Sequence, residues 1–236
     1  MEETNKILHL TTDNKFIQHA YDMFECVFPG QNHVVMLRNS SDCHLYEDID
    51  NIEYIKYFDL INPLFTRKFN GYDIVILHTL SPAWINLVNK SPSDTKFAWI
   101  GWGADYYDLI VESKYDLLLP ETRKHTHNMK NNKNNIKMQI ASVIKWPAKK
   151  IIFSNNKIQA ISKIKSFSPV LYEDYLLLQN NVGIKKLPQY IPWNYINIDS
   201  IFKKCGEMYV EGNAILVGNS ATVTNNHLEV FNLLKN

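Results

Sequence analysis

The chain has 236 residues, of which 45% are hydrophobic and 21% are charged, as in an ordinary globular protein. Its formal net charge of +1 indicates no particular partner. The polar, acidic N-terminus excludes a secretory signal, and no apolar run is long enough to cross a bilayer, so composition predicts a soluble or peripherally attached protein.

The first forty residues alternate a short apolar strand with an amphipathic helix. Residues 6–11 (KILHLT) read as a buried strand, and apolar residues then recur at helical spacing between Phe16 and Phe28. Pro29-Gly30 is expected to end that helix. Residues 33–37 (HVVML) predict the second strand.

The middle of the chain continues the alternation. Residues 72–79 (YDIVILHT) predict a strand, and Ser81-Pro82 predicts the start of a short helix, because proline suits the first helical position. Residues 97–102 (FAWIGW) predict the next strand. Residues 128–135 read as a basic, Asn-rich loop, 136–144 as helical, 158–161 and 165–167 as short strands, and 173–179 as a helix.

Near its end the chain has another apolar run, 213–217 (NAILV), followed by a Gly-Asn-Ser turn and a helix containing Leu228, Phe231 and Leu234. Strands alternating with helices predict an α/β fold with a mostly parallel sheet. We expect an N-terminal domain over 1–182, a linker over 183–212, and the incomplete start of a second α/β domain over 213–236.

Charge is unevenly distributed. The stretch 122–172 has no Asp or Glu but eleven basic residues, while the rest carries 14 basic against 24 acidic residues. This asymmetry favours a surface for polyanions such as anionic lipid, a diphosphate or nucleic acid. An ordinary solvated face in an Asn- and Lys-rich sequence explains it about as well.

The strongest local motif is the segment from Trp99 to Asp108 (WIGWGADYYD). In an open parallel sheet, ligands bind at the carboxyl ends of strands, and this segment places Gly101, Gly103 and Asp105 there. The glycines would let backbone approach a ligand, and the carboxylate would bind or deprotonate a sugar hydroxyl. Alternatively, Asp105 caps the following helix.

The second motif joins the run 213–217 to Gly218-Asn219-Ser220 and the final helix. Strand, turn and helix N-terminus form a possible anion site, although an ordinary strand-to-helix turn also explains the pattern. Other polar residues at strand ends are Asp13 and His78. His125 and His127 are expected in a basic loop without Cys or carboxylate companions, and they are not interpreted as metal ligands.

Together these segments resemble glycosyltransferase family 56, the TDP-N-acetylfucosamine:lipid II N-acetylfucosaminyltransferases of the enterobacterial common antigen pathway. The resemblance rests on W-x-x-W-G-A-D-x-Y over 99–107 and I-L-V-G-N-S-x-x-x-x-N-x-H over 215–227. Weaker matches are L-H-L-x-x-D over 8–13 and His78 followed by Pro82 and Trp84. In the first turn, Thr11-Thr-Asp13 stands where the family has glycine before Ser-Asp.

The resemblance implies a GT-B fold and transfer of a deoxy-amino sugar from a TDP-sugar to a polyprenyl-diphosphate-linked oligosaccharide. It implies catalytic roles for Asp105 and His78, no metal or other cofactor, and no nucleic-acid partner. The implied substrate-binding residues are Asp13, Trp102, Gly103, Gly218, Asn219, Ser220, Asn225 and His227.

The implied location is the cytoplasmic face of the inner membrane, where the basic stretch 122–172 would meet anionic lipid and Trp146, Phe153 and Phe167 would enter the interface. Because the second domain is expected to be incomplete, the chain alone is expected to be inactive. The competing hypothesis is a non-catalytic α/β module that binds anionic lipid or nucleic acid through 122–172.

Overall fold

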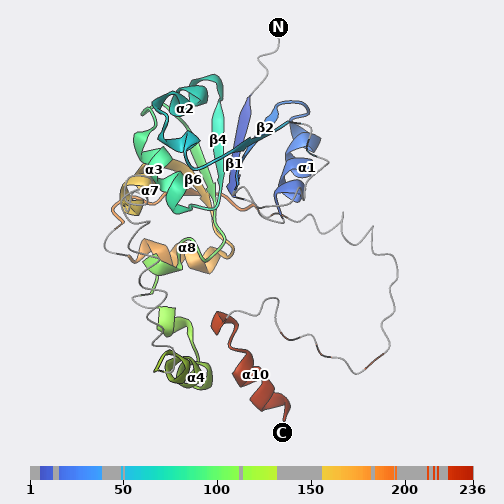
Figure 1. The fold of residues 1–236 in the computed structure, drawn as a ribbon, viewed down its shortest axis with the longest axis vertical. Helices are drawn as coiled ribbons and strands as arrows, with labels where there is room; N and C mark the ends of the chain where they lie inside the picture. The colour runs from blue at the N-terminus through green and yellow to red at the C-terminus, as the bar shows by residue number, and fades with distance from the viewer. Residues whose placement is uncertain are drawn as a thin grey trace.

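The computed structural model describes residues 6–12, 16–38, 49, 51–111, 114–131, 156–181, 184–193, 195, 212, 215, 217 and 223–235. Within these ranges the chain forms a parallel α/β sheet flanked by helices, with two further helices lying beyond one end of the sheet (Figure 1). This confirms the predicted α/β class.

The sheet has seven strands in the order β3-β2-β1-β4-β5-β6-β7, and every pairing is parallel. The strands are β1 (Ile7–Thr12), β2 (Asn32–Leu37), β3 (Ile52–Ile55), β4 (Ile74–His78), β5 (Phe97–Ile100), β6 (Ile164–Ser168) and β7 (Gln189–Tyr190). The order reverses between β1 and β4, as in Rossmann-like folds, and ligands bind such sheets beside that reversal, at the carboxyl ends of the strands.

Helices cover both faces of the sheet, because each strand turns alternate side chains to opposite sides. Helix α1 (Ile17–Val27) packs on one face over Ile7, Val34 and Ile76. The other face carries α2 (Pro63–Arg67), α3 (Pro82–Lys90) and α7 (Lys157–Lys163) (Figure 1). There Trp84, Trp99 and Phe167 belong to the larger core, and each is at most 1% exposed.

The predicted start of α3 is confirmed in detail. Ser81 is the residue before the helix, its hydroxyl accepts a hydrogen bond from the Trp84 N–H at 3.5 Å, and Pro82 is the first helical residue. This capping satisfies one of the N–H groups that a helix start leaves unpaired. The helix therefore begins directly behind the loop that follows β4.

Two sequence predictions were wrong. Residues 158–161, expected as a strand, belong to helix α7, because the Asn156 side chain caps its start by accepting from the Gln159 N–H at 3.1 Å. His125 and His127, expected in a loop, lie in helix α4 (Pro120–Asn131), which begins at a proline. The strand at 165–167 and the helix at 173–179 are confirmed as β6 and α8 (Tyr172–Gln179).

The C-terminal helix α10 (His227–Leu234) packs on α4 rather than on the sheet (Figure 1). The Leu119 N–H donates to Asn226 Oδ1 at 2.7 Å, and the Thr122 N–H donates to Glu229 at 3.0 Å. Of the expected strand 213–217 the structure describes only Ile215 and Val217. Neither is in a strand, and Ile215 is 67% exposed.

Candidate functional site

A cavity of about 560 Å³ lies at the carboxyl ends of β4 and β5, next to the reversal of strand order. One wall is the loop after β4 with the first turns of α3, from Thr79 to Ile85. The second wall is formed by Ala104, Asp105 and Asp108 of the loop after β5, and Lys157 of α7 closes the third side. The volume lies within the range of small-molecule sites.

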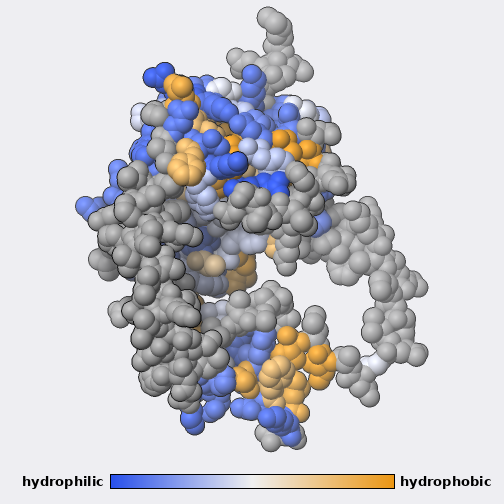
Figure 2. Space-filling view, in the orientation of Figure 1, coloured by the Kyte–Doolittle hydropathy of each residue, from blue (hydrophilic) through white to orange (hydrophobic). Residues whose placement is uncertain are grey.

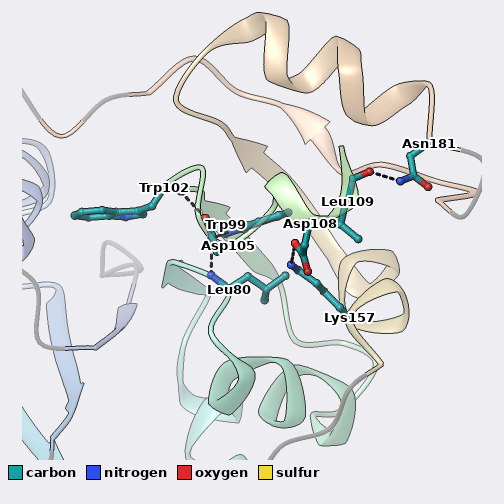
Figure 3. A network of polar contacts seen from close by, with 8 residues as sticks. All are labelled: Leu80, Trp99, Trp102, Asp105, Asp108, Leu109, Lys157 and Asn181. Carbon is teal, nitrogen blue, oxygen red and sulfur yellow. Dashed lines mark hydrogen bonds and ion pairs between the residues drawn. The ribbon is translucent and has the colours of Figure 1, made fainter. Parts of the chain in front are cut away.

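Asp105 joins the two loops that form this cavity (Figure 3). Its Oδ2 accepts hydrogen bonds from the Leu80 N–H and the Trp99 indole N–H, both at 2.8 Å, and its Oδ1 accepts from the Trp102 N–H at 2.7 Å. A carboxylate has about four acceptor positions, so one position on Oδ1 remains. Asp105 follows a strand end, as expected, and it lines the cavity. Its carboxylate braces the two loops and does not cap a helix.

Thr79 is the second unusual feature of this wall. Its φ is 80°, a left-handed conformation that is costly for a β-branched residue. Its N–H donates to the Ile100 carbonyl at 2.9 Å, and the next N–H, of Leu80, is held by Asp105. Backbone strain of this kind is concentrated at functional sites, and here it lies in a residue that lines the cavity.

Asp108 and Lys157 form an ion pair at the mouth of the cavity, with Nζ and Oδ1 2.5 Å apart (Figure 3). The Asp108 side chain is 52% exposed and that of Lys157 is 15% exposed. Sequence reasoning singled out neither residue. Forty-nine positions separate them, and Lys157 read only as one of many basic residues.

The two glycines of the loop have different roles from the one expected. A Cβ at Gly101 would lie 2.6 Å from the Tyr106 ring and 2.8 Å from the Phe167 ring, so Gly101 makes room for the protein's own aromatic core. Gly103 has a φ of 81° and turns the chain beneath Tyr107. Turn geometry and packing therefore explain both glycines without a ligand.

Gly101→Ala is expected to destabilise the fold by about 1–3 kcal/mol, the usual range for overpacking a core. The added methyl must displace two rings that belong to the same aromatic cluster. Thermal unfolding followed by circular dichroism measures the effect. Gly71→Ala is the matched control, because a Cβ there meets nothing within 4 Å. Equal losses for both variants would contradict the packing role.

His78 does not line the cavity, contrary to the placement implied by the resemblance. Its side chain lies on the α1 face, is 0% exposed, and uses both ring nitrogens. Nε2 is 3.0 Å from His9 Nδ1, and Nδ1 is 3.0 Å from the Tyr195 hydroxyl. The cause is register: His78 continues the alternation of Ile74 and Ile76, which face α1.

Burial sets the protonation of these groups. Desolvation lowers the pKa of His9 to about 4, and it holds the pKa of His78 well below its ordinary value, with His9 acting in the same direction. Desolvation also raises the pKa of the Tyr195 hydroxyl. At neutral pH both histidines are uncharged, and neither is placed to touch a ligand in the cavity.

Trp102 also turns away from the cavity (Figure 3). Its indole N–H donates to the Tyr195 hydroxyl at 2.7 Å, and its ring packs 4.8 Å from that of Phe16, centroid to centroid. The loop after β5 therefore serves both faces: Asp105 braces the cavity, while the Trp102 ring covers the α1 side. Trp102 was predicted to bind substrate, but the structure places its ring in contact with other side chains of the protein.

The remaining predicted residues fall into those outside the described ranges and those that the structure places away from the cavity. Asp13, Gly218, Asn219 and Ser220 lie outside the described residues, as do Trp146 and Phe153. Asn225 and His227 lie at the start of α10 beside α4, and neither lines the cavity. Phe167, expected at a membrane interface, is 0% exposed in the core, so that prediction was wrong.

Within the described ranges, no group of three or more His, Cys, Asp or Glu side chains is arranged to hold a metal ion. Nor does any described helix combine the length and apolarity that spanning a bilayer requires. Comparison with models of protein families, with characterised proteins and with solved structures found no match.

Proposed function

We propose that this chain is the acceptor-side part of a GT-B glycosyltransferase, and that its cavity binds a sugar of a polyprenyl-diphosphate-linked oligosaccharide. The reaction would transfer a deoxy-amino sugar from a TDP-sugar, as the motifs at 99–107 and 215–227 suggest. A GT-B glycosyltransferase is built from Rossmann-like domains, and the strand order of this sheet is Rossmann-like.

The observation that carries the proposal is the chemistry of the cavity walls. Carboxylates of Asp105 and Asp108 face the space together with the Ser81 segment, while Leu80 and Ile85 add apolar surface. Sugars present hydroxyl donors around an apolar ring, and a few placed polar groups within an apolar pocket suit them. With Lys157 paired to Asp108, the formal charge of the lining is −1, which disfavours a diphosphate here.

The two carboxylates suit different tasks. Asp105 accepts three N–H donors, and a proton on Oδ2 would displace the donor from Leu80 or Trp99. Its remaining acceptor position suits orientation of a hydroxyl. Asp108 pairs with Lys157 and is half-exposed at the mouth of the cavity. We therefore propose Asp108 as the group that receives the proton of the attacking hydroxyl.

Peripheral membrane attachment is part of the same proposal and is supported by exposed apolar side chains in the described part of 122–172. Val170 and Leu171 are each 55% exposed and Tyr172 is 49% exposed. Val170 and Leu171 follow β6 and Tyr172 is the first residue of α8, so all three lie at the carboxyl edge of the sheet, where the cavity also lies. An acceptor anchored in lipid would then approach the cavity from the membrane surface.

The test is calorimetric titration of the 236-residue chain with a water-soluble, short-chain prenyl-diphosphate oligosaccharide. Ala104→Trp fills the cavity from an exposed position that lines it, and it should weaken binding at least about tenfold, which corresponds to about 1.4 kcal/mol. Asp108→Asn should weaken binding by a similar factor, because it removes an acceptor for a sugar hydroxyl.

Asp94→Asn is the matched control, since Asp94 is an exposed residue at the opposite edge of the sheet, before β5. It should bind as the unaltered chain does. Failure of the unaltered chain to bind the oligosaccharide, or equal binding by all variants, would overturn the proposal. Salt-sensitive binding of RNA or anionic vesicles without any oligosaccharide binding would favour a non-catalytic module.

A further inference from the structure

An unbroken series of side-chain hydrogen bonds crosses the α1 face of the sheet. Glu25 Oε1 is 2.7 Å from Asn32 Nδ2, and Asn32 Oδ1 is 3.2 Å from His9 Nε2. The series continues through the His9–His78 and His78–Tyr195 contacts, both 3.0 Å, to the Trp102 indole at 2.7 Å. It joins α1, β2, β1 and β4 to the loop after β5.

The direction of each hydrogen bond follows from the Asn32 end. The Asn32 Nδ2 group lies 2.7 Å from two acceptors, Glu25 Oε1 and the Phe28 carbonyl, so its orientation is determined and Oδ1 is an acceptor. His9 must therefore donate from Nε2, which leaves Nδ1 to accept from His78 Nε2–H. A neutral His78 then accepts at Nδ1 from the Tyr195 hydroxyl, whose oxygen accepts from Trp102.

This arrangement works only while both imidazoles are neutral. His9, His78 and Asn32 are each at most 1% exposed. A second proton on His9 Nδ1 would face the N–H of His78, and one on His78 Nδ1 would force the Tyr195 hydroxyl to turn away and change its hydrogen bonds. The series does not conduct protons from Glu25 to the histidines, because it passes through the amide of Asn32, which carries no labile acid.

The charged and titratable groups around the pair are few. Glu25 of α1 and His33 of β2 act on His9 with opposite signs, and His9 itself acts on His78. Asp105 of the loop after β5 acts on Tyr195. Among the described residues, no carboxylate hydrogen-bonds to either imidazole. A proton added to the pair would therefore have no direct counter-charge.

The Trp102 end of the series is connected to the wall of the cavity. Trp102 is held by Tyr195 through its indole, while its backbone N–H donates to Asp105 Oδ1. Asp105 in turn fixes Leu80 beside the strained Thr79. A shift of Trp102 therefore changes the position of the carboxylate that braces both cavity walls.

We propose that His9, His78 and Tyr195 are positioning residues for the cavity: their neutral, one-directional hydrogen-bond series holds the Trp102–Asp105 loop, and proton uptake by the histidine pair releases it. The ligand need not be the sugar proposed above, because the hydrogen-bond series acts on the wall of the cavity. His78 thus acts on the site from behind the sheet, through Tyr195 and Trp102.

The first test determines the tautomers of the two buried histidines in the unaltered chain. Two-bond ¹H–¹⁵N spectra of histidine-labelled protein at pH 7 should show two buried histidines, both neutral and both protonated at Nε2. His9→Gln and His78→Gln assign the signals. Either residue as the Nδ1–H tautomer, or charged at pH 7, would overturn the proposal without any variant having to fold.

The second test measures whether the Trp102–Asp105 loop is released. Tyr195→Phe removes only the hydroxyl, and it should move the Trp102 indole N–H resonance and speed hydrogen exchange at the Trp102 and Leu80 amides about tenfold. Lowering the pH of the unaltered chain should produce the same changes as the buried pair takes up a proton, with exchange expressed relative to the intrinsic amide rate at each pH. The Trp84 indole, which has no hydrogen-bond partner among the described residues, serves as an internal reference.

Tyr190→Phe, a half-buried tyrosine of β7, and His19→Gln, an exposed histidine of α1, are matched controls. Neither should alter the Trp102 signals or their pH profile. Exchange at the Trp102 and Leu80 amides that is unchanged in Tyr195→Phe, or altered equally by the controls, would overturn the positioning role. Neither readout requires a ligand or a transfer reaction, so failure of the proposed function would leave this inference standing.

Discussion

Asp105→Asn is expected to lower the free energy of unfolding by about 2–4 kcal/mol, because hydrogen bonds to a charged group contribute about 1.5–3 kcal/mol each. Asparagine offers one acceptor oxygen and turns an NH₂ group toward a donor. Three N–H groups converge on both oxygens of the native carboxylate, so at least one of Leu80, Trp99 and Trp102 must lose its partner. Urea unfolding followed by circular dichroism at pH 7 measures the loss.

Asp108→Asn is the control for this prediction, since it makes the same chemical change three residues away in the same loop. Asp108 is half-exposed and pairs with Lys157, and a surface ion pair is worth at most about 1 kcal/mol. The two variants should therefore differ clearly in stability. Comparable losses would show that Asp105 does not brace the loops.

The second large expected effect is a loss of stability on mild acidification. Burial depresses the pKa of both His9 and His78 in the folded chain, whereas the unfolded value is about 6.5. Below that pH the unfolded chain binds more protons, so stability is complete above about pH 6.5 and falls as pH drops toward the folded value, which for His9 is about 4. The half-buried His33 adds a smaller effect of the same sign.

Between pH 7 and 5, His9 alone is expected to reduce the free energy of unfolding by about 2 kcal/mol, since each pKa unit corresponds to about 1.36 kcal/mol. The lowered pKa of His78 adds to this loss. Urea unfolding at half-unit pH intervals measures the slope. His9→Gln should be less stable than the unaltered chain at pH 7 but should show a shallower slope. A slope unchanged in His9→Gln, or equally changed in His19→Gln, would contradict the assignment to the buried pair.

The site shows why sequence reasoning located a loop but not its contacts. The Trp-Gly-Ala-Asp motif at the end of an apolar strand pointed to Asp105, and the cavity lies there. Its partner Leu80 is 25 positions away and reaches it because β4 and β5 are neighbours with parallel register. The pairing of His9 with His78, 69 positions apart, depends on β1 and β4 being neighbours. Nothing in the local sequence of either histidine indicates the other.

The C-terminal helix presents a different case. Its apolar residues predicted a helix, and α10 is one, but Phe231, Leu233 and Leu234 are 47%, 76% and 50% exposed. Figure 2 shows these hydrophobic side chains gathered on the helix at one end of the molecule. Periodicity predicts that an apolar face exists. It does not state what covers that face. Here the Thr122 N–H of α4 donates to Glu229 of α10, and Asn226, the residue before α10, bonds to the backbone of Leu117 and Leu119.

The amino-acid sequence by itself determined the α/β class, the main parallel strands and the start of α3, because apolar runs and a Ser-Pro cap act over a few neighbouring residues. It also marked the loop after β5. Only the tertiary structure decided that Gly101 serves an aromatic core and that His78 faces α1. Those outcomes depend on strand order, register and burial, which arise from contacts between residues far apart in the chain.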